Sequence, residues 1–157
     1  MRYCKTLKPD SWSKLPICAS TALVVGDFGV ISAQLPYDRE KCAMIKDHSL
    51  AGQVNKVIDN LEEILKKQGL DLSYVVKVTV YLTDLNQYEE MDKIYGKRFS
   101  DPYPARTCVE VTNLFDGAKV QMDAWFIDTK KYEKSESCHN QDYCDDDSCG
   151  IIPDLRT

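Results

Sequence analysis

Arg106 lies in the stretch YPARTCVEV, residues 103–111, at the start of an apolar run that favours a β-strand. Alternate side chains of a strand point to the same side, so Arg106, Cys108 and Glu110 are expected to share one face. A guanidinium donates parallel hydrogen bonds from a planar fork that matches a carboxylate. Arg106 is therefore a candidate for binding an anionic ligand, although an ordinary Arg106–Glu110 pair at a sheet edge fits the same pattern.

The elements that must position this strand begin with a hairpin and a helix. Residues 21–35 contain two short runs rich in β-branched side chains around Gly26, which indicates a β-hairpin. From Ser49 onward, apolar residues recur at helical spacing with charged residues opposite, and Gly69 suits the end of this helix.

The second half of the chain predicts a strand, a helix and two more strands. Residues 73–84 alternate in polarity, with Lys, Thr and Tyr on one side. The other side of this strand is predicted to carry Val76, Val78, Val80 and Leu82. A helix at 86–99 and strands at 105–112 and 119–128 follow.

The predicted order β-β-α-β-α-β-β contains no internal repeat. It indicates an α+β fold in which two helices pack on one face of a mostly antiparallel mixed sheet. The other face carries Val, Tyr, Cys, Trp and Ile among its polar residues, which predicts burial against another subunit.

Length and charge limit the possible functions. The 157 residues suit a single domain, predicted at 1–128 with an extended lead-in over 1–20, followed by a Cys/Asp-rich tail at 129–157. The net charge of −5 and the lack of a basic stripe argue against binding to nucleic acid. No apolar run is long enough to span a membrane, and the first residues lack the apolar core of a secretory signal, so a cytoplasmic location is expected.

Seven cysteines, an odd number spread along the chain, are expected to be reduced thiols rather than a disulfide framework. Three of them lie in the tail with His139, but their spacing lacks the paired C-x-x-C geometry of common zinc sites. No metal site is therefore predicted.

Five segments of the chain resemble the RidA/YjgF (endoribonuclease L-PSP-like) family, in its order and with its spacing over residues 20–128. They are GVISAQLPYD, QVNKVIDNLEEILKKQGL, VVKVTVYLTDLNQYEEMDKIYGKRF, PARTCVEV and AKVQMDAWFID. The resemblance implies a chorismate-mutase-like architecture and a homotrimer with ligand sites in the clefts between subunits. It also implies hydrolytic deamination of small 2-imino acids, which are enamine/imine intermediates, to 2-keto acids and ammonia. No metal or organic cofactor is implied.

The resemblance also assigns substrate-binding residues. Arg106 corresponds to the family arginine that grips the substrate carboxylate, and Cys108 to a cysteine that lines the same cleft. Ser32 matches the serine of the family's S-G-Q motif, and Ala33 stands where the family usually has glycine. A family tyrosine of the N-terminal segment has no clear counterpart between Leu15 and Asp27.

Two positions of the implied catalytic group differ from the family. Gln121 stands where the deaminases have a glutamate that positions the attacking water, and Asp92 stands where they have an asparagine. Because carboxylate and amide are exchanged, Asp92 is predicted to orient or deprotonate water, with Gln121 as its hydrogen-bonding partner. The alternative is that Asp92 simply faces solvent on its helix.

Two functions are therefore expected from the sequence. The first is deamination of 2-imino acids, and the second is non-catalytic binding of small carboxylates such as 2-keto acids. The residue at the water position discriminates between them, because the Gln121 amide can orient water but cannot take a proton. Either function involves a small-molecule partner, with no nucleic acid and no membrane.

Overall fold

A computed structural model of the chain describes residues 4–7, 18–130 and 132. Its longer strands are β1 (Cys4–Leu7), β2 (Ala22–Val25), β3 (Phe28–Gln34), β6 (Val75–Leu82), β7 (Ala105–Glu110) and β8 (Val120–Ile127). A short pair is formed by β4 (Tyr37–Asp38) and β5 (Ala43–Met44), and the helices are α1 (Leu50–Lys66) and α2 (Tyr88–Arg98).

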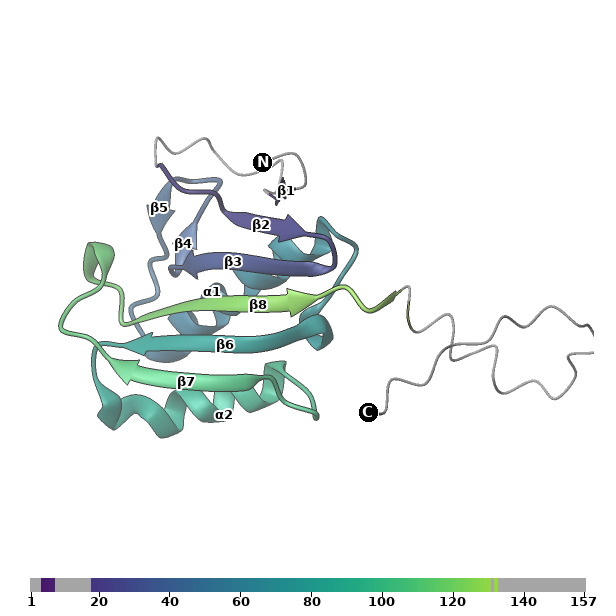
Figure 1. Cartoon of the computed structure of the whole chain (residues 1–157). Coiled ribbons are helices and arrows are strands. Elements are labelled where there is room, and N and C mark those ends of the chain that lie inside the picture. The colour runs from purple at the N-terminus through teal and green to yellow at the C-terminus, as the bar shows by residue number, and fades with distance from the viewer. Residues whose placement is uncertain (1–3, 8–17, 131, 133–157) are drawn as a thin grey trace, which may run out of the picture.

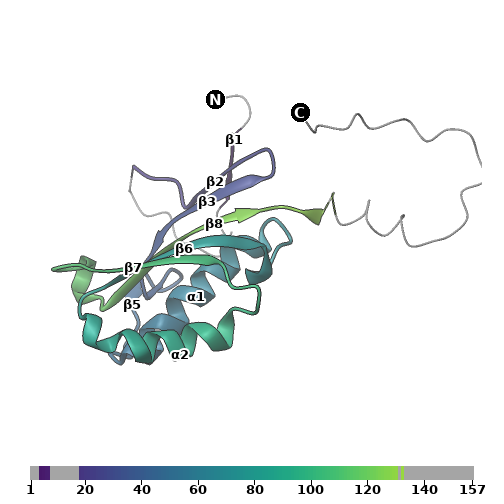
Figure 2. The ribbon, with the colours of Figure 1, turned by 60° about the horizontal axis from the view of Figure 1, so that its bottom comes forward.

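Within the described residues, six strands form one sheet in the order β1-β2-β3-β8-β6-β7 (Figure 1). All neighbours in the sheet are antiparallel except β6 and β7, which run parallel and are joined through α2. Both helices lie on the same face of the sheet (Figure 2). The predicted α+β fold with a mostly antiparallel mixed sheet is thus confirmed.

Helix α1 begins and ends where the sequence predicts. The Ser49 hydroxyl accepts a hydrogen bond from the Gly52 amide at 3.0 Å and caps the helix. The chain leaves the helix through Gly69, whose φ of +69° is a conformation that glycine adopts without strain. One face of α1 is buried against the sheet and consists of Leu50, Gln53, Val54, Val57, Ile58, Asn60, Leu61, Ile64 and Leu65.

The sequence analysis assigned Val76 of β6 to the wrong face of the sheet. Val78, Val80 and Leu82 are fully buried beneath the helices, but Val76 is 40% exposed. The register between β6 and β8 shifts between Val75 and Lys77, so that Val75 takes the buried position instead. Such an irregularity adds one residue to a strand and reverses the alternation on one side of it.

The two ends of the described chain add contacts that the sequence patterns do not reveal. The lead-in contains β1, which pairs antiparallel with β2. Beyond Asp128, the Lys130 ammonium donates to the Gly69 carbonyl, and the Tyr132 hydroxyl donates to Asp27 at 2.8 Å. The predicted tail, with its three cysteines and His139, lies otherwise outside the described residues, and the boundary at residue 128 stays a prediction. No helix of the described part is long and apolar enough to cross a membrane.

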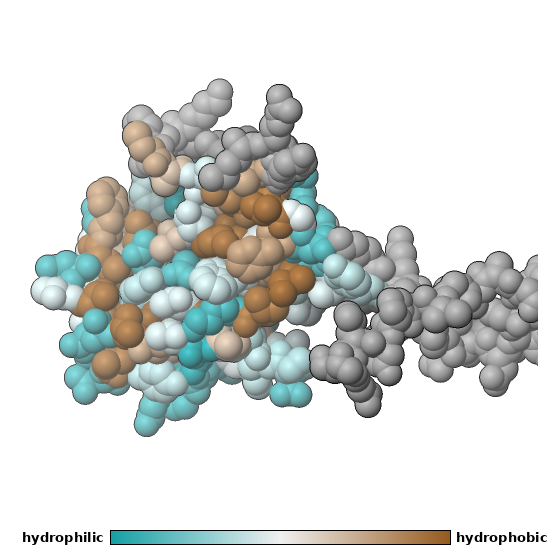
Figure 3. All heavy atoms as spheres, viewed as in Figure 1, coloured by the Kyte–Doolittle hydropathy of each residue, from teal (hydrophilic) through white to brown (hydrophobic). Residues whose placement is uncertain are grey.

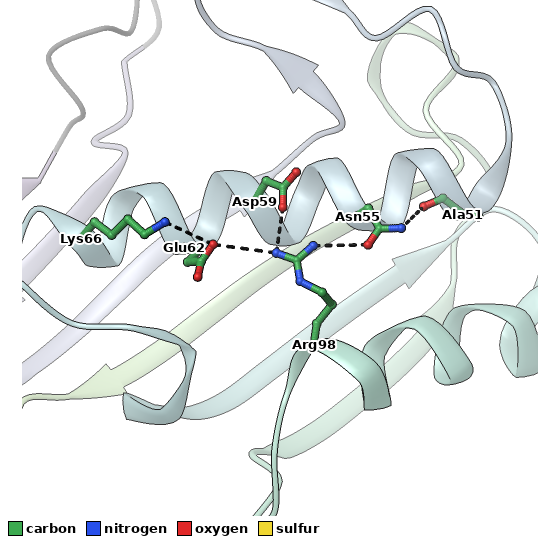
Figure 4. A network of polar contacts seen from close by, with 6 residues as sticks. All are labelled: Ala51, Asn55, Asp59, Glu62, Lys66 and Arg98. Atoms are coloured by element: carbon green, nitrogen blue, oxygen red, sulfur yellow. Dashed lines mark hydrogen bonds and ion pairs between the residues drawn. The ribbon is translucent and has the colours of Figure 1, made fainter.

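Arg98 joins the two helices. From the end of α2 its guanidinium donates to Asn55 at 3.2 Å and to Asp59 at 2.7 Å, both on α1, and lies 3.9 Å from Glu62. Figure 4 shows this network, which continues along α1 from Glu62 to Lys66. Because α2 carries the residues of the site described below, Arg98 helps to fix the site relative to the core.

Replacing Arg98 with alanine is expected to lower the free energy of unfolding by about 1 kcal/mol, since charge-assisted hydrogen bonds at a partly exposed position are lost. Urea unfolding at a fixed protein concentration measures the change. Lys66→Ala is the control, because it removes only an exposed pair with Glu62 and should cost less than about 0.5 kcal/mol. Equal losses in the two variants would contradict a special role for Arg98.

Candidate functional site

The strand β7 presents Arg106 and Cys108 to the helix side of the sheet. Arg106 pairs with Val78 and Cys108 pairs with Val80 on the parallel neighbour β6. Residues paired across a sheet share a face, and both valines are fully buried beneath the helices. The predicted common face of Arg106 and Cys108 is therefore the inner face, where α2 lies.

Arg106 is held by three side chains of α2. Its Nη2 atom donates to the Asp92 carboxylate at 2.5 Å and to the Tyr88 hydroxyl at 2.7 Å. The guanidinium carbon lies 4.6 Å from the centre of the Tyr95 ring and 5.5 Å from that of Tyr88, within the range of cation–π attraction. These residues recur at i, i+4 and i+7, which places them on one face of the helix.

A cavity of about 390 Å³ opens beside this cluster. Its size falls within the range of small-molecule sites. It is lined by Asp92, Tyr95, Gly96, Tyr103, Pro104 and Arg106. The sequence analysis identified Arg106 and Asp92 but did not single out Tyr88 or Tyr95. Their spacing relative to Asp92 is the signal that could have indicated a common face toward Arg106.

The electrostatics of the cluster favour a permanent positive charge on Arg106. Partial burial acts to lower its pKa, but the hydrogen bonds that it donates to Asp92 and Tyr88, together with the electrostatic attraction of these two groups, outweigh that effect and raise the pKa above the usual value. Burial raises the pKa of Tyr95 to about 12, so this phenol stays protonated near neutral pH. The hydroxyl of Tyr95 is buried without a hydrogen-bond partner among the described residues.

Glu110 is not the partner of Arg106, which rules out the ordinary Arg106–Glu110 pair. The Glu110 carboxylate instead accepts a hydrogen bond from the Leu85 amide at 2.8 Å. Asp92 is also more than a residue that simply faces solvent: its side chain is 50% exposed, yet one carboxylate oxygen is paired with Arg106.

Gln121 lies on the opposite face of the sheet. It pairs with Tyr81 on β6, and both alternate with the buried Val120, Met122, Val80 and Leu82. On this outer face the Tyr81 hydroxyl donates to Asp123 at 3.0 Å. One subunit therefore does not bring Gln121 to Asp92 or Arg106, and the predicted cooperation of Asp92 and Gln121 on a water stays a prediction.

Ser32 and Ala33 are also remote from Arg106 within one subunit. They lie in β3, which two strands separate from β7, a distance of about 14 Å at ordinary strand spacing. The register of β3 shifts between Ile31 and Gln34, and the Ser32 hydroxyl donates to the Ser20 carbonyl at 2.7 Å. Their predicted role in substrate binding stays a prediction.

Cys108 is a poor nucleophile in this environment. Burial raises the pKa of its thiol, and the opposing effect of Arg106 is smaller. Since the thiolate is the reactive form, the raised pKa argues against covalent catalysis. Cys108 is not among the residues that line the cavity, and its predicted role in substrate binding stays a prediction. Among the described residues, no group of three or more His, Cys, Asp or Glu side chains could hold a metal ion.

Comparison with known proteins identifies the family. A family model described as Endoribonuclease L-PSP matches residues 19–127. A crystal structure of RidA from an Antarctic Psychrobacter bacterium aligns with a TM-score of 0.72 at 30% identity, covering 78% of this chain and 98% of that one. The chain belongs to the RidA/YjgF family.

Two relatives of this chain come from different organisms and carry different names. A RutC family protein of Pyrococcus abyssi is 39% identical over 105 residues, which span 67% of this chain and 82% of that protein. A human protein named 2-iminobutanoate/2-iminopropanoate deaminase is 31% identical over 105 residues, which span 67% of this chain and 76% of that protein. The family therefore includes a named imine deaminase.

Alkylation of Cys108 tests the environment of the site. A raised pKa keeps the thiol protonated to a higher pH, so labelling by iodoacetamide should accelerate at a higher pH in the folded protein than in the unfolded one. Peptide mass spectrometry across a pH series measures the rate, and the same cysteine in urea is the control. Coincident pH profiles for the two states would contradict the raised pKa.

Proposed function

We propose that this chain is a hydrolase that deaminates small 2-imino acids. Water adds to the carbon of the C=N bond, the C–N bond breaks, and a 2-keto acid and ammonia leave. Membership of a family that includes a named imine deaminase supports the proposal.

The observation that carries the proposal is the set of hydrogen-bond donors that the Arg106 guanidinium keeps available for a ligand. Both of its described hydrogen bonds leave from Nη2. Among the residues that the structure describes, none accepts a hydrogen bond from Nη1 or Nε, and the cavity opens beside this side chain. Each of these nitrogens can donate a charge-assisted hydrogen bond to the carboxylate of a 2-imino acid.

The main contribution of the protein to this reaction is to position the substrate and one water molecule. A protonated imine is already electrophilic, so anchoring its carboxylate and presenting one water covers much of the task. The Cys108 thiol, whose pKa burial raises, is not needed as a nucleophile. The proposal includes no metal and no organic cofactor.

A second candidate function is non-catalytic binding of small carboxylates such as 2-keto acids. It is favoured by Gln121, whose amide cannot accept the proton of an attacking water. The two functions differ in one observable: only the first accelerates ammonia release from an imino acid. A threonine dehydratase that generates 2-iminobutanoate in the assay supplies the substrate.

We further propose that the outer face of the sheet is buried in a homotrimer. An outer patch, defined as Leu23, Val25, Phe28, Val30 and Trp125, lies on neighbouring strands with each side chain 36% to 50% exposed. The Phe28 and Trp125 rings meet edge to face at 5.8 Å. Figure 3 shows hydrophobic side chains gathered over β2, β3 and the end of β8. An exposed apolar cluster of this kind is typical of a subunit interface.

Assembly through this face would complete the site. Gln121 lies on the same outer face, whereas Arg106 lies on the inner face at the sheet edge. A neighbouring subunit that packs against the outer face would bring its own edge strand near Gln121. We also propose a cytoplasmic location and small-molecule partners only, since a net charge of −5 offers no attraction to nucleic acid or anionic membranes.

Arg106→Ala should weaken binding of 2-oxobutanoate and slow ammonia release by roughly 10- to 100-fold, the scale of losing hydrogen bonds to a charged group. Arg106→Lys should also weaken binding, because an ammonium lacks the five planar donors with which Arg106 can bond Asp92, Tyr88 and a ligand together. Calorimetric titration and the coupled ammonia assay measure the two effects, with Lys66→Ala as a surface control. Unchanged affinity in a folded Arg106→Ala variant would refute the assignment.

The protein should sediment at equilibrium as a trimer. Trp125→Glu places a charge in the outer patch and should shift the equilibrium toward the monomer, because a buried unpaired carboxylate is costly. Lys66→Glu, which introduces the same side chain on exposed helix surface, should leave the trimer intact. A monomeric unmodified protein would disprove this assembly.

A further inference from the structure

The Arg106 cavity carries both signs of charge. Arg106 and Asp92 line the same cavity and form an ion pair at 2.5 Å. A 2-keto acid held by Arg106 would place its carboxylate next to that of Asp92, and like charges at this range repel. The cavity is therefore poorly matched to a simple carboxylate.

The hydrogen-bonding atoms that Arg106 and Asp92 keep available indicate a better-matched ligand. Arg106 keeps Nη1 and Nε available, as described above. Asp92 uses Oδ1 for Arg106, and no described residue donates a hydrogen bond to its Oδ2. One ion pair thus offers charge-assisted donors for a carboxylate and an acceptor for an N–H group.

We propose that Asp92 makes this cavity selective for small zwitterions, which are molecules with a carboxylate and a protonated nitrogen attached to the same carbon. Arg106 binds the carboxylate and Asp92 accepts a hydrogen bond from the cationic nitrogen. This inference rests on the proposed function and deepens it: the protonated 2-imino acid is such a zwitterion, whereas the 2-keto acid product is a monoanion. Loss of the nitrogen leaves Asp92 facing the product carboxylate, which favours release of the product.

Asp92 can serve this role because the fold does not depend on it. Its side chain is half exposed, while Met91 and Tyr95 of the same helix are buried in the core. Arg106 also retains Tyr88 and the Tyr95 ring as partners when Asp92 changes. Asp92→Asn preserves size and shape, removes the charge and replaces one acceptor oxygen with an amide donor. It therefore separates ligand recognition from folding.

The test compares two stable ligands in calorimetric titrations of the full chain near neutral pH. The probes are 2-aminobutanoate, a zwitterion that stands for the protonated imine, and 2-oxobutanoate, the monoanion. The unmodified protein should bind 2-aminobutanoate more tightly. In Asp92→Asn, affinity for 2-aminobutanoate should fall and that for 2-oxobutanoate should rise, each by about tenfold or more, so that the preference reverses. Glu90→Gln removes the same charge from an exposed position of α2 and should keep the original preference.

An unchanged preference in Asp92→Asn, or no detectable binding of 2-aminobutanoate to the unmodified protein, would overturn the proposal. Kinetics provide an independent readout. A raised KM with nearly constant kcat in Asp92→Asn supports recognition of the substrate nitrogen, whereas a lowered kcat at constant KM would assign Asp92 to the water and overturn it. The binding preference is measured without turnover. A reversal in a protein that releases no ammonia would therefore refute the deaminase function and leave the selectivity standing.

Discussion

Helix α1 packs its apolar face across the inner side of the sheet, and this one-sided burial is the constraint around which the rest of the molecule is arranged. Val54, Ile58 and Leu61 are fully buried in the same core as Ile31 and Met122 of the central strands. Each such side chain contributes about 1.5–3 kcal/mol relative to exposure. Because α1 covers the middle of the sheet, α2 is placed over the β6–β7 edge, where only part of its surface is needed for the core.

The position of the site follows from the parallel pairing of β6 and β7. A parallel pair requires a crossover, and here the crossover contains α2, so the helix that connects the strands also faces the second of them. Arg106 enters the space between β7 and α2 and meets Asp92 there. The cluster around Arg106 is therefore a product of chain connection as much as of the individual side chains.

Much of this architecture could be predicted from local patterns. The helical periodicity after Ser49 and the glycine at position 69 were sufficient for α1, and alternation placed Arg106 and Cys108 on one face. Alternation failed at Val76, because the register irregularity beside it depends on pairing with a distant strand. The strand β1 could not be recognised either, since a short edge strand of mixed polarity has no distinctive period.

The site was only partly predictable for a related reason. The nature of Arg106 as an anion-binding group is intrinsic to its chemistry, but its choice of Asp92 over Glu110 depends on how α2 is oriented. Tyr88 and Tyr95 occupy spacings that an ordinary core helix also uses, so sequence alone does not reveal that they enclose a guanidinium. Gln121 and Ser32 lie far from Arg106 within one subunit, and no pattern within one strand specifies which residues a second subunit would bring to the site.

The exposed placement of Asp92 has an evolutionary consequence. Aspartate and asparagine codons differ by a single base, and the side chain makes no contribution to the buried core. A lineage could therefore exchange the two residues without passing through a poorly folded intermediate. Residues that touch a ligand but not the core allow the chemistry of a small scaffold to diversify while selection on its folding stays almost unchanged.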